Sequence, residues 1–280
     1  MKVQLLVALP RALAWALLCC GCGNSAELCG EQLAAHELRV FSGSILEGEA
    51  LSPGKNTGCK EATARQTIDA LSRALDKLPT SARVPLDVHV DVSVDLQAAL
   101  PVRTVEAHAS GALLVGKAPT DETIWLHEIF HTQAGHPTSS APLVARTLRA
   151  LEEGSADYFA ATFAGTAQVG GRDGREVRNL MGPERADELL WLRFAQGKAD
   201  SHLLGSMFAR ELWSERPSSP GVAQALVGCL RNATQAQLKD VSELSASCPK
   251  SSRPVVERAV ARWTLRSPQT PTNPPRPEEL

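Results

Sequence analysis

The sequence predicts an α+β fold with strands in the N-terminal half and helices in the C-terminal half. Residues 84–95, VPLDVHVDVSVD, alternate strictly between apolar and polar side chains, which is typical of a strand with one buried face. From about residue 120 to 266 the apolar residues follow mainly helical spacing. The chain has 280 residues and 43% apolar content, which is enough to bury a sizeable core.

The N-terminus is predicted to be an export signal. Residues 1–21 combine the basic residues Lys2 and Arg11 with an apolar run that ends in small residues and cysteines. The ending LLCCGC resembles the bacterial lipoprotein signal, which implies a lipid anchor on Cys22, although Cys19 stands where that signal prefers an aliphatic residue. A plain secretory signal is the alternative. Lipidation would place the mature protein in the cell envelope, bound to a bacterial membrane.

Export explains the number of the remaining cysteines, because an even set can pair in disulfides. With the signal removed and Cys22 acylated, an even set is left: Cys29, Cys59, Cys229 and Cys248. Three pairings are possible, and pairing neighbours in sequence closes the shortest loops. We therefore expect Cys29–Cys59 and Cys229–Cys248 disulfides, each worth ~2–4 kcal/mol in an oxidising compartment. A cysteine zinc site is the competing interpretation, but the mature chain has no CxxC spacing.

The elements before residue 120 are predicted in order. Residues 61–78 form an amphipathic helix that ends at Pro79, with one apolar face: Ala64, Ile68, Leu71, Leu75 and Leu78. The strand that follows carries Asp87, His89 and Asp91 on its polar face, which we interpret as a solvated surface rather than a metal site. Residues 105–116, VEAHASGALLVG, predict further strand structure with a turn near Gly111.

Charge and composition complete the domain organisation. The net charge is −2 and lysine–arginine clusters are scarce, so there is no footprint for nucleic acid. A disulfide-containing segment (22–60) follows the signal, then the helix and strands (61–119) and the helical part (120–266). Residues 267–280 are proline-rich and polar, which predicts a disordered tail. The sequence does not predict an oligomeric state.

The stretch IWLHEIFHTQAGHP, residues 124–137, holds the residues with chemical potential. Asp121 or Thr120 can cap a helix that covers it, with acidic residues at the positive end. On that helix His127 and His131 are four apart, so both imidazoles project from one face. Two neutral ring nitrogens placed in this way can share one Zn²⁺ ion.

A catalytic zinc site also needs a base and a third protein ligand, and the chain offers candidates for both. Glu128 lies to the side of the histidine face, where its carboxylate can reach a water at the metal without binding the metal. A buried helix with two ordinary histidines is the alternative. Downstream, RALEEGSADYFAATFAG is compatible with a helix that carries Glu153 and Asp157 four apart on one face. Glu152 is a second candidate ligand, but it lacks an acid four residues on and points to a different face.

HExxH followed about twenty residues later by EGSADYF resembles the gluzincin metallopeptidases, the thermolysin-like clan. The resemblance covers about residues 112–213 and implies a zincin-like fold, in which a small mixed or antiparallel sheet packs on the HExxH helix. It also implies that Glu153 is the third zinc ligand and that Asp157 accepts from the imidazole of His127. An outer carboxylate of this kind fixes the tautomer of a ligating histidine and strengthens it as a donor.

A rival third ligand is His136. The metzincin pattern requires glycine three and histidine six residues after the second motif histidine, but Ala134 and Pro137 stand there, so His136 is out of register. We interpret it as a loop residue at the helix exit. Met181, in NLMGP, is interpreted as a loop anchor rather than a metzincin methionine turn, and Tyr158 as a core residue.

The run SHLLGSMFARELW, residues 201–213, resembles a later gluzincin helix whose tyrosine steadies the oxyanion. His202 stands at the position of that tyrosine and is expected to take its role. The alternative is a surface histidine at the start of a helix. The notable departure from the family is therefore a histidine in place of the tyrosine.

The predicted function is hydrolysis of a peptide or protein substrate by a zinc-activated water, with Glu128 as general base. We expect residues 112–116 to form an edge strand that binds the substrate by strand addition. Two other classes stay open: an exported zinc-binding lipoprotein without catalytic activity, and an exported structural module without a metal.

Overall fold

The computed structural model describes residues 38–42, 62–83, 86–90, 105–107, 112–115, 121–171, 177–236 and 238–265. Several predictions fall outside these ranges: the signal and Cys22, the pair Cys29–Cys59, residues 91–95 of the alternating run, and the tail. They stay predictions.

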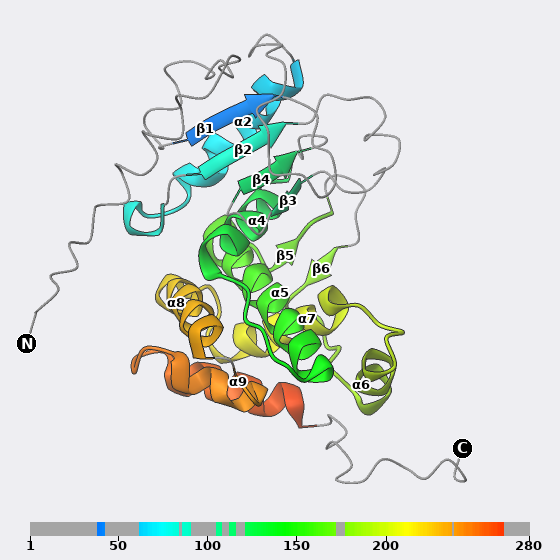
Figure 1. Cartoon of the computed structure of the whole chain (residues 1–280). Helices are drawn as coiled ribbons and strands as arrows, with labels where there is room; N and C mark the ends of the chain where they lie inside the picture. Colours follow the sequence, from blue (N-terminus) through cyan, green and yellow to red (C-terminus); the bar gives the residue numbers. More distant parts are fainter. Residues whose placement is uncertain are drawn as a thin grey trace, which may run out of the picture.

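A four-stranded mixed sheet forms the upper layer in Figure 1. Its order is β1 (Leu38–Ser42), β2 (Leu86–Val90), β4 (Ala112–Val115) and β3 (Val105–Ala107). The first three strands are parallel, and β3 runs antiparallel to β4. The two strands predicted within 105–116 are therefore present and adjacent.

The prediction that residues 112–116 form an edge strand is wrong. Strand β4 pairs with β2 on one side and with β3 on the other, so β3 borders the sheet among the described strands. The physical reason is that backbone pairing with two other strands decides which strand is internal, and neither partner is specified by the sequence of residues 112–116 itself.

Helix α2 (Ala62–Asp76) packs beside the sheet and ends shortly before Pro79, as predicted. Its apolar face buries Leu71 and Leu75, and Leu78 is buried just beyond its end. A short 3₁₀ turn, η3 (Thr80–Ala82), then leads into β2, where Leu86 and Val88 are buried on one face. Alternate residues on one side of β2 thus enter the core.

Helices α4 (Glu122–Ala134) and α5 (Pro142–Ala164) form the centre of the molecule. The side chain of Asp121 caps α4 by accepting from the amide of Thr123. Helix α4 contacts β3 and β4 as well as α5, and most of its residues are buried, including Trp125, Leu126, Ile129 and Phe130. The predicted packing of the sheet on the HExxH helix is therefore present.

The rest of the described chain is mainly helical, as expected. A small antiparallel pair, β5 (Gln168–Val169) and β6 (Arg178–Asn179), precedes the remaining helices. These are α6 (Glu188–Ala195), α7 (Ser201–Glu215), α8 (Pro220–Ala236), η4 (Val241–Ser247) and α9 (Arg253–Thr264). Helix α5 lies among α4, α7 and α8, so its middle is enclosed on several sides (Figure 1).

Two glycines set the spacing between α5 and α7. A Cβ atom on Gly205 would lie only 2.5 Å from the carbonyl oxygen of Ala150 and 2.8 Å from the amide of Gly154. A Cβ on Gly154 would overlap the carbonyl of Gly205 in turn. Because neither residue has a side chain, the two backbones can approach directly, and this brings the first turn of α7 beside Glu153.

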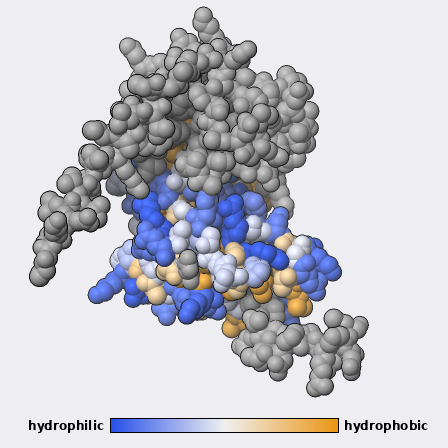
Figure 2. Space-filling view, in the orientation of Figure 1, coloured by the Kyte–Doolittle hydropathy of each residue, from blue (hydrophilic) through white to orange (hydrophobic). Residues whose placement is uncertain are grey.

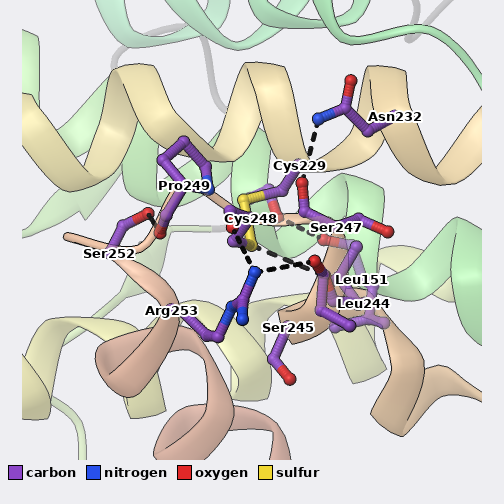
Figure 3. Close-up of a disulfide and its surroundings, with 12 residues drawn as sticks. Leu151, Cys229, Asn232, Leu244, Ser245, Ser247, Cys248, Pro249, Ser252 and Arg253 are labelled. Carbon is purple, nitrogen blue, oxygen red and sulfur yellow. Dashed lines mark hydrogen bonds between the residues drawn. A yellow bond between two sulfur atoms is a disulfide. The ribbon is translucent and has the colours of Figure 1, made fainter.

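A disulfide joins Cys229 of α8 to Cys248, which follows η4, so this predicted pair is confirmed (Figure 3). Both cysteines are buried. Nearby, the side-chain amide of Asn232 donates to the carbonyl of Ser247 at 3.0 Å and Arg253 donates to the carbonyl of Cys248 at 3.3 Å. Disulfides are typical of oxidising compartments.

The surface of the helical part is mostly hydrophilic in the view of Figure 2. The large apolar side chains that are exposed in the helical part of the chain include Leu189 and Leu192 on α6. Within the described ranges we find no helix that combines the length and the apolar character needed to cross a bilayer.

Candidate metal centre

His127 and His131 of α4 meet Glu153 of α5 in the interior of the molecule. Their exposed fractions are 3%, 4% and 1%. The nitrogen and oxygen atoms that they can offer to a metal ion all lie within 4.8 Å of one another. The structure thus brings together the three residues that the sequence selected from two separate stretches.

The spacing of these atoms fits a small divalent ion. The Nε2 atoms of the two histidines are 3.2 Å apart, and they lie 3.1 Å (His127) and 3.3 Å (His131) from Oε2 of Glu153. Ligands at about 2.0–2.1 Å from a tetrahedral zinc are separated by about 3.3 Å. The donor set of two imidazoles and one carboxylate is also one that zinc uses in catalytic sites.

His127 is oriented by a buried carboxylate. Its Nδ1 lies 2.8 Å from Oδ1 of Asp157, which is fully buried. Nη2 of Arg178 lies 3.2 Å from the same oxygen. With Nδ1 held in this way, Nε2 faces His131 and Glu153. Asp157 thus has the position that the family resemblance implies for it.

His131 has a partner of the same kind that sequence reasoning missed. Its Nδ1 lies 2.7 Å from Oε1 of Glu152, which is buried. Glu152 therefore contacts Nδ1 of His131, on the opposite side of the ring from Nε2. It does not take the place of a metal ligand, for which the sequence made it the second candidate. The number of histidines could have indicated this contact, because the second buried imidazole needs a hydrogen-bond acceptor just as the first does.

The electrostatics of the site favour a bound cation. Burial would lower the pKa of His131, but hydrogen bonds to Glu152 and Glu153 raise it to about 10. Burial would raise the pKa of Glu152, but its hydrogen bonds to His131 and His136 lower it to about 2. Three buried carboxylates (Glu152, Glu153 and Asp157) thus surround two imidazoles, and positive charge, as protons or as a metal ion, stabilises them.

His202 lies on the more open side of the centre, in the first turn of α7. Its Nε2 is 3.2 Å from Oε2 of Glu153, and its ring stacks on that of His127 with centroids 6.3 Å apart. The side chain is 53% exposed, and burial of the remainder lowers its pKa. It is not in the group of atoms that lie within 4.8 Å of one another.

Glu128 and His136 also border the centre. Glu128 is partly exposed, although both of its neighbours in sequence are buried, and Arg149 lies within its electrostatic reach. His136 follows the end of α4, as expected for a loop residue at the helix exit, and its Nδ1 lies 2.8 Å from Oε1 of Glu152. It therefore contacts the partner of His131, and its ring stacks on that of His131 with centroids 6.5 Å apart, but it lies outside the group of ligand atoms.

Two further residues lie away from the centre. Met181 is exposed, so the interpretation of this residue as a loop anchor is wrong, and it does not pack beneath the metal centre either. Tyr158 is buried, and its hydroxyl donates to the carbonyl of Arg216 at 2.6 Å, which agrees with the predicted core role.

No protein-family description, curated protein or solved structure matches this chain. Two imidazoles and one carboxylate are arranged as a site that could hold a metal ion, and Glu128 directly follows one of these residues in sequence.

Proposed function

We propose that this protein is an exported zinc metallopeptidase of the gluzincin type, with His127, His131 and Glu153 as ligands of Zn²⁺. The observation that carries the proposal is the buried triad, whose interatomic distances of 3.1–3.3 Å match the edges of a zinc tetrahedron. Zinc bound there would lower the pKa of a water molecule toward about 7 and polarise the carbonyl of the substrate.

Glu128 is the general base of the proposed reaction. It directly follows His127, and it is partly exposed while His127 and Ile129 are buried. Its carboxylate can accept a proton from the attacking water and deliver it to the leaving amine. A purely structural metal site needs no such base, so the position of Glu128 supports hydrolysis.

His202 is proposed to donate a hydrogen bond to the oxyanion that develops on the substrate carbonyl. The Gly154–Gly205 contact between α5 and α7 places its ring beside Glu153 on the exposed side of the centre. Donors fixed in advance near the developing charge contribute much of the rate enhancement in acyl transfer.

The substrate is proposed to bind along β3 in extended form. This strand borders the sheet among the described strands, contacts α4, and can accept another strand by backbone hydrogen bonding.

Export and lipid anchoring through Cys22 belong to the same proposal. The Cys229–Cys248 disulfide supports an oxidising compartment. We expect wild-type protein in the membrane fraction of cells and a Cys22→Ala variant outside it. Equal partition of the two proteins into the membrane fraction would contradict the anchor.

A second candidate function is zinc binding without catalysis. In that function His202 would be a fourth ligand that closes the site, since its Nε2 lies 3.2 Å from Glu153 Oε2, although it is outside the group of atoms within 4.8 Å of one another. The exposure of His202 and the presence of Glu128 favour the open, catalytic site instead.

The test compares zinc content and cleavage of a peptide library for the wild type and Glu128→Gln. Glu122→Gln is the matched control, because Glu122 lies on the same helix and pairs with Lys77 at 2.8 Å. We expect Glu128→Gln to keep zinc and lose cleavage, and the control to keep both. A zinc-loaded wild type that cleaves no peptide would favour the second function, and active Glu128→Gln would contradict the role of Glu128.

A further inference from the structure

Glu152 links the metal centre to the surface. Its Oε1 accepts from Nδ1 of His131 at 2.7 Å and from Nδ1 of His136 at 2.8 Å, and its Oε2 lies 3.3 Å from Nη1 of Arg149. The carboxylate itself is 1% exposed, whereas the side chains of His136 and Arg149 are 34% and 47% exposed. We call His136, Arg149 and Glu152 the outer cluster.

The same arginine also contacts the triad. Nη2 of Arg149 lies 2.9 Å from Oε1 of Glu153, while Oε2 of Glu153 faces the ring nitrogens of His127 and His131. The planar fork of a guanidinium suits contact with two carboxylates at once. Arg149 therefore joins the carboxylate that orients His131 to the carboxylate of the triad.

These contacts leave distinct atoms for the metal. Oε1 of Glu153 faces Nη2 of Arg149 as an ion pair without hydrogen-bond geometry, and Oε2 is the oxygen that the carboxylate presents toward the two imidazoles. Because Nδ1 of His131 is held by Glu152, its ring presents Nε2. Partners of this kind fix ligand orientation, and their loss typically weakens metal binding 10–100-fold.

We propose that His136 and Arg149 are positioning residues for the metal centre: both hold Glu152, which orients His131, and Arg149 also restricts Glu153 to one coordinating oxygen. The inference rests on the metal-binding part of the proposed function and is independent of whether the centre hydrolyses peptides. It assigns a role to two residues outside the HExxH and ExxxD motifs, including the histidine that the sequence offered as a rival ligand.

The experiment measures the zinc affinity of the purified full chain by competition with a chromophoric chelator. The variants are His136→Ala, Arg149→Gln, Glu152→Ala and the double variant His136→Ala/Glu152→Ala. Arg258→Gln is the matched control. Arg258 is an exposed arginine on helix α9, outside the outer cluster, and it pairs with Glu215 at 2.7 Å. Circular dichroism establishes that each variant is folded.

We expect affinity to fall about 10-fold or more for Glu152→Ala, by a smaller factor for His136→Ala and Arg149→Gln, and not at all for Arg258→Gln. The double variant should bind zinc as weakly as Glu152→Ala alone, because His136 acts through Glu152. If Glu152→Ala does not fold, Glu152→Gln, which keeps the side-chain shape, takes its place in the cycle.

The absorption spectrum of the Co²⁺-loaded protein provides a readout that a general loss of stability would not move. We expect Arg149→Gln to change the ligand-field bands, because Glu153 can then bind through both oxygens, and Arg149→Lys to restore them in part. Wild-type affinity and spectra in both His136→Ala and Arg149→Gln would overturn the inference, as would additive losses in the double variant. A wild type that binds no zinc would instead overturn the proposed function.

Discussion

The two imidazoles of the candidate metal centre have similar partners but different surroundings. His127 is backed by Asp157 and then Arg178, which is 18% exposed, so the outermost residue on this side is half-buried. His131 is backed by Glu152 and then by Arg149, which is 47% exposed. Each histidine thus has a carboxylate and each carboxylate an arginine, but the arginine on the His131 side is the more exposed of the two.

The two carboxylates are both buried, so the difference lies in the exposure of the residues that contact them. A carboxylate in the interior has little water to replace a lost partner, so the His127 side, with the less exposed arginine, depends more on the protein itself. Near the surface, water can take over part of a lost contact. The comparison predicts unequal responses to equivalent substitutions.

The largest effect is expected from removing the residue that both sides share. Glu153→Ala removes the only carboxylate that faces both Nε2 atoms in the described structure. Zinc affinity should fall by more than the 10–100-fold that is typical for loss of an outer partner. Equilibrium dialysis with elemental analysis measures this, and Glu211→Ala, at a buried glutamate that pairs with Arg262, should keep its zinc. Wild-type zinc binding by Glu153→Ala would remove it from the ligand set.

The next effect separates binding from chemistry. Glu128→Gln should lower kcat for peptide cleavage by about 10²–10⁴-fold, because general-base catalysis contributes a factor of this size. Its zinc affinity should remain within a few-fold of the wild type. Steady-state kinetics on one cleaved peptide provides the measurement, and unchanged kcat would assign the base elsewhere.

A third prediction compares the two sides directly. Asp157→Ala and Glu152→Ala should both weaken zinc binding, within the range of about 10–100-fold. The loss should be larger for Asp157→Ala, since its surroundings are less exposed to solvent, and chelator competition on both variants gives the ratio. A larger loss for Glu152→Ala would contradict the distinction between the less exposed and the more exposed side.

The smallest effects concern the packing that holds His202 beside Glu153. Gly205→Ala should lower the free energy of unfolding by about 1–3 kcal/mol, because its Cβ would meet backbone atoms of α5. Gly228→Ala is the matched control in α8, where a Cβ meets nothing within 4 Å, and it should raise stability by up to about 1 kcal/mol. Urea denaturation measures both. Equal stability of the two variants would show that the α5–α7 contact does not require glycine.

Sequence patterns predicted the parts of the site that depend on local spacing. The four-residue intervals His127–His131 and Glu153–Asp157 place each pair on one helix face, and the cap at Asp121 marks where the first helix begins. The disulfide between Cys229 and Cys248 followed from short loop closure.

The parts that were missed depend on tertiary contacts. Strand order decides that β4 is internal, and the order cannot be obtained from alternation within one strand. Glu152 meets His131 across 21 residues of sequence, and Arg178 reaches Asp157 from a separate strand. The close approach of Gly154 and Gly205 likewise becomes visible only when α5 and α7 are packed together.

Zinc K-edge X-ray absorption on the zinc-loaded wild type tests the central claim most directly. We expect two imidazole nitrogens at about 2.0–2.1 Å from the zinc, with oxygen atoms completing the coordination. A spectrum with three imidazoles would make His202 a ligand and close the site. Sulfur ligation, or a purified protein that retains no zinc, would contradict the assignment of the metal to His127, His131 and Glu153.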